Sequence, residues 1–277
     1  MENQFTQHYK GSWLKFSLLS ILMMLGGGLF AGPFYLMVRN HPLQEVILLP
    51  VPFIFSILIL FWYVHNREHL PLSSVGIYRT YAFRKLGIGG LFGFIVFSVV
   101  ILILVLFGNI SIVGNTLNQT VLLGIGLAFI GFCIQASAEE LLMRGYLQTR
   151  LTQRYGDRFA IVCSAVVFTL LHGMNPNISI VGVTNIFLVG IVLSLIYRID
   201  GTIWIVAGFH IIWNFVQGCI YGINVSGNEL NFSLFKTKYH TDNILTGGTM
   251  GIEGSIILTV LFIVLIINLA KRLKVNF

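Results

Sequence analysis

Residues 137–146 read Ser-Ala-Glu-Glu-Leu-Leu-Met-Arg-Gly-Tyr and place three charged side chains at the end of an apolar run. The run itself, residues 120–134, contains no Asp, Glu, Lys, Arg or His. A charged side chain at the centre of a bilayer costs roughly 2.5–3.5 kcal/mol even on lenient insertion scales. The adjacent glutamates Glu139 and Glu140 therefore need a neutralising partner, a bound proton or a chemical role.

The composition is that of a multi-pass membrane protein. Of the 277 residues, 56% are hydrophobic and 10% are charged, and the mean hydropathy is +0.86, well above that of soluble domains. The net charge of +7 is not gathered into a basic patch with interleaved aromatic residues, so nucleic acid is not an expected partner. The cysteines, Cys133, Cys163 and Cys219, lie in apolar segments without metal-type spacing, which predicts neither a disulfide framework nor a cysteine metal site.

The hydropathy pattern predicts an all-α transmembrane bundle of about eight spans, with residues 1–277 as a single domain. The expected spans are 16–38, 46–64, 86–107, 120 to about 150 or 154, 159–172, 178–197, 202–223 and 252–270. The fourth is expected to continue as one helix through Glu139 and Glu140, because no proline interrupts it. The glycine-rich connector before the last span is interpreted as a solvated loop that could cover the outer mouth of a cavity.

The loops differ in positive charge. Eight spans put both termini on one side of the membrane, and with Arg144 set aside the loops of that side hold thirteen Lys and Arg residues, Lys10 and Lys274 among them. The other side holds three, namely Arg39, Lys236 and Lys238. The positive-inside rule therefore predicts a cell-membrane protein with both termini in the cytoplasm.

Two histidines are expected at the depth of the acidic pair. A rise of about 1.5 Å per residue puts Glu139, His172 and His210 roughly 16, 20 and 12 Å from the cytoplasmic ends of their helices. In a hydrocarbon core about 30 Å thick these levels overlap. The fourth, fifth and seventh spans are therefore expected to bring the three side chains into one cavity.

Local spacing separates the roles of these polar groups. Glu140 and Arg144 are four residues apart and share a helix face, which favours a structural ion pair. Glu139 is rotated by about 100° and has no local cation, so it is the better candidate for proton transfer. His210 and Asn214, also four apart, can present a ring nitrogen and an amide to one point, as an oxyanion site requires.

Three motifs in this order resemble the CPBP family of intramembrane proteases, the CAAX-protease and bacteriocin-processing group also called Abi, which includes the type II CAAX prenyl endopeptidases. The motifs are Glu139-Glu140-x-x-x-Arg144, Phe168-x-x-x-His172 and His210-x-x-x-Asn214. The resemblance covers mainly residues 135–222, which form the motif core. The stretches 225–227 and 247–255 are similar to bacterial members.

The resemblance implies an intramembrane endopeptidase in which Glu139 and His172 activate water, and His210 and Asn214 stabilise the oxyanion. The supporting residues would be Glu140, Arg144 and Phe168. The implied partners are the lipid bilayer and a membrane-associated peptide or protein, either prenylated or carrying a leader peptide. The similarity to bacterial members favours a peptide or protein substrate that needs no lipid.

Metal dependence and two other protein classes stay open. No cofactor is favoured, but Glu139, His172 and His210 are residue types that bind zinc. Buried acids and histidines also form the proton relays of transporters, although no paired helices broken by glycine or proline accompany them here. An inactive relative that serves as a bacteriocin-immunity or scaffold protein is the third reading, against which the intact polar set argues.

Overall fold

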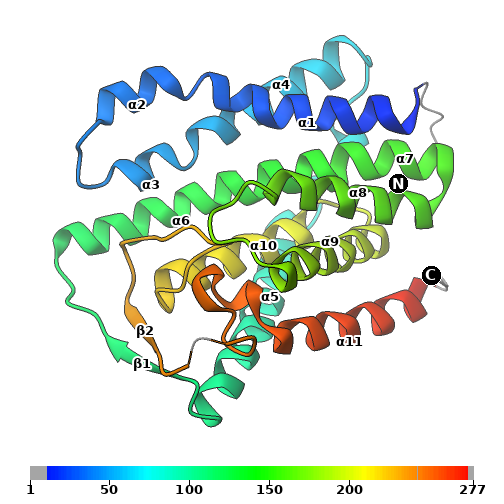
Figure 1. Ribbon diagram of the computed structural model, residues 1–277. Coiled ribbons are helices and arrows are strands. Elements are labelled where there is room, and N and C mark those ends of the chain that lie inside the picture. Colours follow the sequence, from blue (N-terminus) through cyan, green and yellow to red (C-terminus); the bar gives the residue numbers. More distant parts are fainter. Residues whose placement is uncertain (1–10, 242, 274–277) are drawn as a thin grey trace.

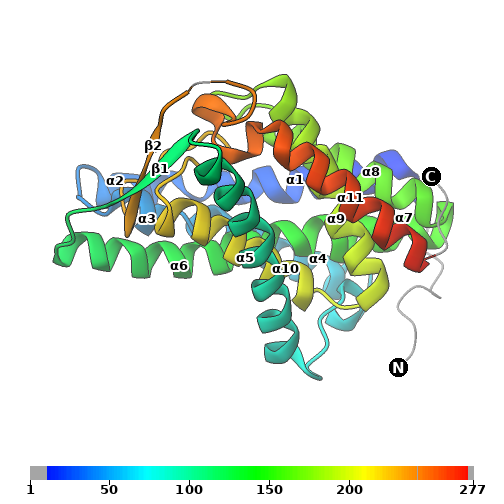
Figure 2. The same cartoon turned by 90° about the horizontal axis from the view of Figure 1, so that it is seen from below.

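The computed structural model describes residues 11–241 and 243–273, so the predicted cytoplasmic charges Lys10 and Lys274 lie outside the described residues. The described part is mostly helical, which confirms the predicted all-α bundle (Figure 1). Two short strands, β1 (Ile110–Gly114) and β2 (Phe235–Tyr239), pair antiparallel at one end of the bundle (Figure 2). They were not predicted, because both lie in connectors interpreted as irregular.

One long helix crosses the whole molecule, as predicted (Figure 1). It consists of α6 (Gln119–Glu140), the π-helical segment η3 (Leu141–Gln148) and α7 (Thr149–Tyr155). The side chain of Asn118 caps its start by accepting the N–H of Val121 at 3.0 Å. All eight residues of the π segment are buried, and such wide turns occur frequently at functional sites.

The first two expected spans form a layer across this long helix (Figure 1). Each is interrupted once, giving α1 (Trp13–Leu29), α2 (Gly32–Val38), α3 (Gln44–Leu48) and α4 (Val51–Asn66). A proline stands in the first turn of both α2 and α4, where it starts a helix more readily than it continues one. These prolines explain why a new helix starts within each expected span.

The remaining helices lie on the other side of α6. They are α5 (Ala82–Leu106), α8 (Asp157–His172), α9 (Ile180–Asp200), α10 (Trp204–Phe215) with the π segment η4 (Val216–Ile220), and α11 (Ile256–Leu273). Helices α5 and α10 cross closely, since a Cβ on Gly89 would overlap the carbonyl of Ile205. A Cβ on Gly208 would likewise overlap the carbonyl of Leu86.

Six segments of the described chain are long and apolar enough to cross a membrane. They are 13–38, 44–66, 82–106, 119–155, 180–200 and 256–273. The other two expected spans exist as helices but are shorter, α8 with 16 residues and the stretch 204–220. The predicted number of about eight is thus approximately right for the number of helical crossings, and the chain is a multi-pass membrane protein.

Two predictions about connectors need correction. Arg150, counted among the cytoplasmic loop charges, is fully buried and binds the loop after α4, where it contacts Glu68 at 2.6 Å and the carbonyl of Ser74 in η2 (Leu72–Val75) at 2.7 Å. The glycine-rich connector is solvated only in part: Glu229 and His240 are exposed, whereas Met250 near its end is 1% exposed. Its short helices are η5 (Gly248–Met250) and η6 (Ile252–Gly254).

Candidate active site

Glu139 faces both histidines across a short gap. Its Oε2 lies 3.9 Å from Nε2 of His172 and 3.8 Å from Nε2 of His210. The other carboxylate oxygen accepts the amide of Gln135 at 3.2 Å. Oε2 is buried and accepts no hydrogen bond from the described residues. Helices α6, α8 and α10 thus bring these three side chains together in one cavity.

In both histidines, the ring nitrogen farther from Glu139, Nδ1, is hydrogen-bonded to an acceptor oxygen. Nδ1 of His172 lies 2.8 Å from the backbone carbonyl of Phe168, and Nδ1 of His210 lies 2.9 Å from Oε1 of Glu140. Carbonyl and carboxylate oxygens only accept, so both Nδ1 atoms carry the proton. In the neutral rings, both Nε2 lone pairs therefore face Glu139.

Glu140 binds two partners with the same oxygen. Its Oε1 accepts from Arg144 at 2.9 Å and from His210 at 2.9 Å, and both charged side chains are fully buried. Arg144 also donates to the carbonyl of Gly190 at 3.1 Å and lies over the ring of Phe168, 4.6 Å from its centroid. The predicted ion pair is therefore present, and its contact with His210 was not foreseen.

The predicted neighbours Asn214 and Phe168 also lie at this site. The ring of Phe168 packs on that of His172 with centroids 4.4 Å apart. Asn214 is buried and donates to Gln135 through a long hydrogen bond of 3.5 Å. Both residues line the same cavity as Glu139.

This cavity, called here the reaction cavity, has a volume of about 340 Å³. Its polar wall carries Glu139, the two histidines and the amides of Gln135 and Asn214. The opposite wall comes from the N-terminal layer and is apolar. Its residues are Met24, Leu25, Leu49 and Phe53. A polar reactive wall facing an apolar one suits a substrate that is itself partly buried in lipid.

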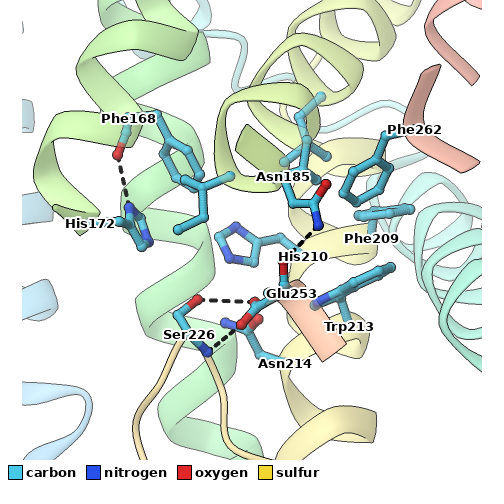
Figure 3. Close-up of a pocket in the computed structure, with 13 residues that line it drawn as sticks. Phe168, His172, Asn185, Phe209, His210, Trp213, Asn214, Ser226, Glu253 and Phe262 are labelled. Carbon is cyan, nitrogen blue, oxygen red and sulfur yellow. Dashed lines mark hydrogen bonds between the residues drawn. The ribbon is translucent and has the colours of Figure 1, made fainter. Parts of the chain in front are cut away.

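A second, smaller cavity adjoins the first and contains an acid that sequence reasoning missed. This inner cavity has a volume of about 30 Å³ and shares Phe168, His172, His210, Asn214 and Ser226 with the reaction cavity. Figure 3 shows the carboxylate of Glu253 facing it between Ser226 and Asn214. Glu253 was overlooked at the edge of the expected span 252–270; the structure starts α11 at Ile256 and leaves Glu253 in the connector before it. Its only signal was its place inside the 247–255 stretch.

The residues do not fit a zinc ion as they stand. Zinc ligands at about 2.0–2.2 Å in tetrahedral geometry lie roughly 3.3–3.5 Å from one another, whereas Glu139 is 3.8 and 3.9 Å from the two ring nitrogens. Within the described residues, no group of three His, Cys, Asp or Glu side chains is spaced to hold a metal.

The fold and the site together define a multi-pass helical membrane protein with a carboxylate–histidine–amide centre inside the bundle. Residues 119–216, which hold all three motifs, match the profile of the family described as type II CAAX prenyl endopeptidase Rce1-like. This match supports the family predicted from the three motifs. Comparisons with curated proteins and with solved structures gave no significant match.

Proposed function

We propose that the protein is an intramembrane endopeptidase in which Glu139 and His172 activate water, while His210 and Asn214 stabilise the oxyanion. The observation that carries this proposal is the position of Glu139 Oε2, at 3.8 and 3.9 Å from two ring nitrogens whose other nitrogens are already bound. A water molecule beside the line between these atoms can donate to the carboxylate and to one ring nitrogen. The match to a protease family supports a peptide or protein as the substrate.

Counting hydrogen bonds assigns a proton to His210. Glu139 Oε2 and two neutral Nε2 atoms are three acceptors, and a single water supplies two protons. If His210 is to donate to an oxyanion through Nε2, it must carry a second proton, because Nδ1–H is used by Glu140. Glu140 and Glu139, both beside His210, stabilise that imidazolium.

The reaction then proceeds in two steps. The bridging water gives a proton to Glu139 while its oxygen attacks the scissile carbonyl carbon, and the resulting oxyanion accepts from His210 Nε2–H and the Asn214 amide. The tetrahedral intermediate collapses as the carbon–nitrogen bond breaks. The proton held by Glu139 passes to the leaving nitrogen, with His172 Nε2 next to its path. Glu139 is returned as a carboxylate.

We propose that the reaction is metal-free, because Glu139, His172, His210 and Asn214 account for the steps above and the spacing does not fit zinc. The purified protein should keep its peptidase activity in chelator. Activity that vanishes with chelator and returns with zinc would overturn this part of the proposal.

We also propose that both termini face the cytoplasm. In support, α1 begins and α11 ends at the end of the bundle where α7 ends (Figure 1), and the N–H of Trp13 donates to the hydroxyl of Tyr155 at 3.2 Å. A cysteine placed at Arg79 should react with a membrane-impermeant thiol reagent only in permeabilised cells. A cysteine placed at Glu229 should react in intact cells, and the reverse pattern would reject this topology.

The substrate is best sought with protein reconstituted in lipid vesicles. Prenylated C-terminal peptides and unlipidated leader peptides are incubated with wild type, His172→Ala and His240→Ala, and the products are identified by mass spectrometry. His240 is an exposed histidine of the outer connector and serves as the matched control. Cleavage by wild type and His240→Ala alone supports the proposal, whereas equal products from all three contradict it. Proton-driven uptake into the vesicles without cleavage would favour a transporter.

A further inference from the structure

The inner cavity has room for water and the groups to bind it. Its volume of about 30 Å³ is enough for about two water molecules, since each needs roughly 10–15 Å³ measured in this way. Polar atoms of Asn214, Ser226 and Glu253 line it together with both histidines. Aromatic rings close the remaining side. They belong to Phe209, Trp213 and Phe262 (Figure 3).

Glu253 is held firmly at the edge of this cavity. Its carboxylate accepts the N–H of Ser226, the hydroxyl of Ser226 at 3.0 Å and the amide of Gln217 at 3.2 Å. Its backbone carbonyl accepts from Asn185 of α9 at 2.7 Å. Ser226 adopts a positive φ of 48°, a conformation that costs energy for a residue with a side chain. Three separate parts of the chain thus fix the position of one carboxylate.

The charge of Glu253 is not paired with a lysine or arginine, and the nearby ionisable side chain is that of His172. Across residues 11–241 and 243–273, no lysine or arginine forms an ion pair with it. The three donors are neutral, and burial raises the pKa of this carboxyl. A glutamine could keep most of these contacts without the cost of burying a charge. Water solvates a carboxylate well. Contact with water therefore explains an acid at this position, which packing alone does not.

We propose that the inner cavity is a water-binding site of the protease, in which Glu253 and Ser226 hold water against Asn214 and the two histidines. The inference rests on the proposed function, because hydrolysis consumes one water per turnover in a site surrounded by apolar helices. The five residues shared by the two cavities form the wall through which water passes to Glu139. Glu253 is a positioning residue, acting on the reaction through the water that it holds.

Radiolytic labelling tests the hydration directly. Hydroxyl radicals produced from bound water by X-rays oxidise the side chains next to it, and mass spectrometry locates the products. Full-length wild type in lipid is expected to label rapidly at Trp213 and Phe262. Glu253→Leu, which replaces the acid by an apolar side chain, should lose this labelling, while Glu253→Gln should keep it. The control is Glu229→Leu, which removes an exposed acid of the same connector.

Turnover of a cleaved peptide supplies the second readout. In Glu253→Leu, kcat should fall by about tenfold with KM little changed, because bound water and not peptide binding is lost. Glu253→Gln should recover most of this kcat, and Glu229→Leu should match wild type. Thermal midpoints show whether a variant has lost its fold. If Glu253→Leu does not fold, the comparison of Glu253→Gln with wild type and the labelling of wild type decide whether the water site exists.

The outcomes separate this inference from the proposed function. Labelling of Trp213 in a wild type that cleaves no peptide leaves the water site standing and removes the protease assignment. A cleaving wild type with no labelling at Trp213 and Phe262 overturns the water site. So does a Glu253→Leu variant that keeps its kcat, or that loses kcat while its labelling is unchanged.

Discussion

Nδ1 of His210 lies 2.9 Å from Oε1 of Glu140, the same oxygen to which Arg144 donates. This single contact joins the ion pair of the long helix to the candidate oxyanion donor on α10. Glu140 therefore has two tasks: it neutralises a buried arginine, and it fixes the ring of His210 with Nε2 directed at Glu139. The second acid of the pair is as much a part of the site as the first.

Glu140→Gln should damage both stability and turnover. Removing one member of a fully buried ion pair costs about 3–5 kcal/mol, because Arg144 is left without its carboxylate. His210 would also lose the acceptor that holds its Nδ1 proton. The thermal midpoint and kcat should fall together. Replacing both partners, as in Glu140→Gln with Arg144→Met, should recover stability but not turnover, and recovery of turnover would show that Glu140 serves only the fold.

Asn214→Ala should lower kcat by about 10²–10³ with little change in KM, the effect of losing one oxyanion donor. The matched control is Asn268→Ala on α11, an exposed asparagine whose amide donates to the carbonyl of Val264 in the same helix. Steady-state kinetics on one cleaved peptide compare the two. A rise in KM at constant kcat would mean that Asn214 binds the substrate in its ground state instead.

The crossing of α5 and α10 should not tolerate a methyl group. Gly89→Ala places a Cβ against the carbonyl of Ile205, and overpacking of this kind costs about 1–3 kcal/mol. Gly87→Ala in the same helix meets no atom of the described residues within 4 Å and should be neutral or slightly stabilising. Thermal unfolding in detergent measures both variants. Equal midpoints would show that the helices can separate without cost.

Stability should depend on pH through Glu253. Burial raises the pKa of this carboxyl above its usual value of 4.5. A raised folded-state pKa means that the contribution of Glu253 is fully present below pH 4.5 and is lost as the pH rises through the folded-state value. A glutamine side chain does not titrate. The thermal midpoint of Glu253→Gln should therefore rise relative to that of wild type as the pH increases from 4.5 to neutrality. A constant difference between the two proteins would contradict the raised pKa.

The sequence predicted the parts of the site that lie on regular helices. Glu139, His172 and His210 could be placed at one depth because helical rise is constant, and Arg144 could be paired with Glu140 because four residues make about one turn. The bond from His210 to Glu140 joins different helices and depends on their rotation, which spacing within one helix does not determine. Glu253 could not be predicted as a site residue because its position depends on long-range contacts with Ser226 and Asn185.

The breaks in the first two spans and the π segment differ in how far they could be foreseen. Proline in the first turn of α2 and α4 is a readable signal for a new helix. The π-helical segment after Glu140 has no comparable sequence signal. Gly145 in this turn lies against the carbonyl of Val75. Directly after the turn, the hydroxyl oxygens of Thr149 and Tyr197 are 3.0 Å apart. Tertiary packing decides such a turn, and composition does not reveal it.

The central claim is that Glu139 activates the water, and Glu139→Gln tests it most directly. This substitution keeps the size of the side chain and removes its ability to take a proton. With protein reconstituted in lipid and one cleaved peptide, we expect the cleavage rate to fall by at least about 10³, while Glu229→Gln cleaves like wild type and all three proteins keep the same thermal midpoint to within a few degrees. Cleavage by Glu139→Gln at the wild-type rate would contradict the claim.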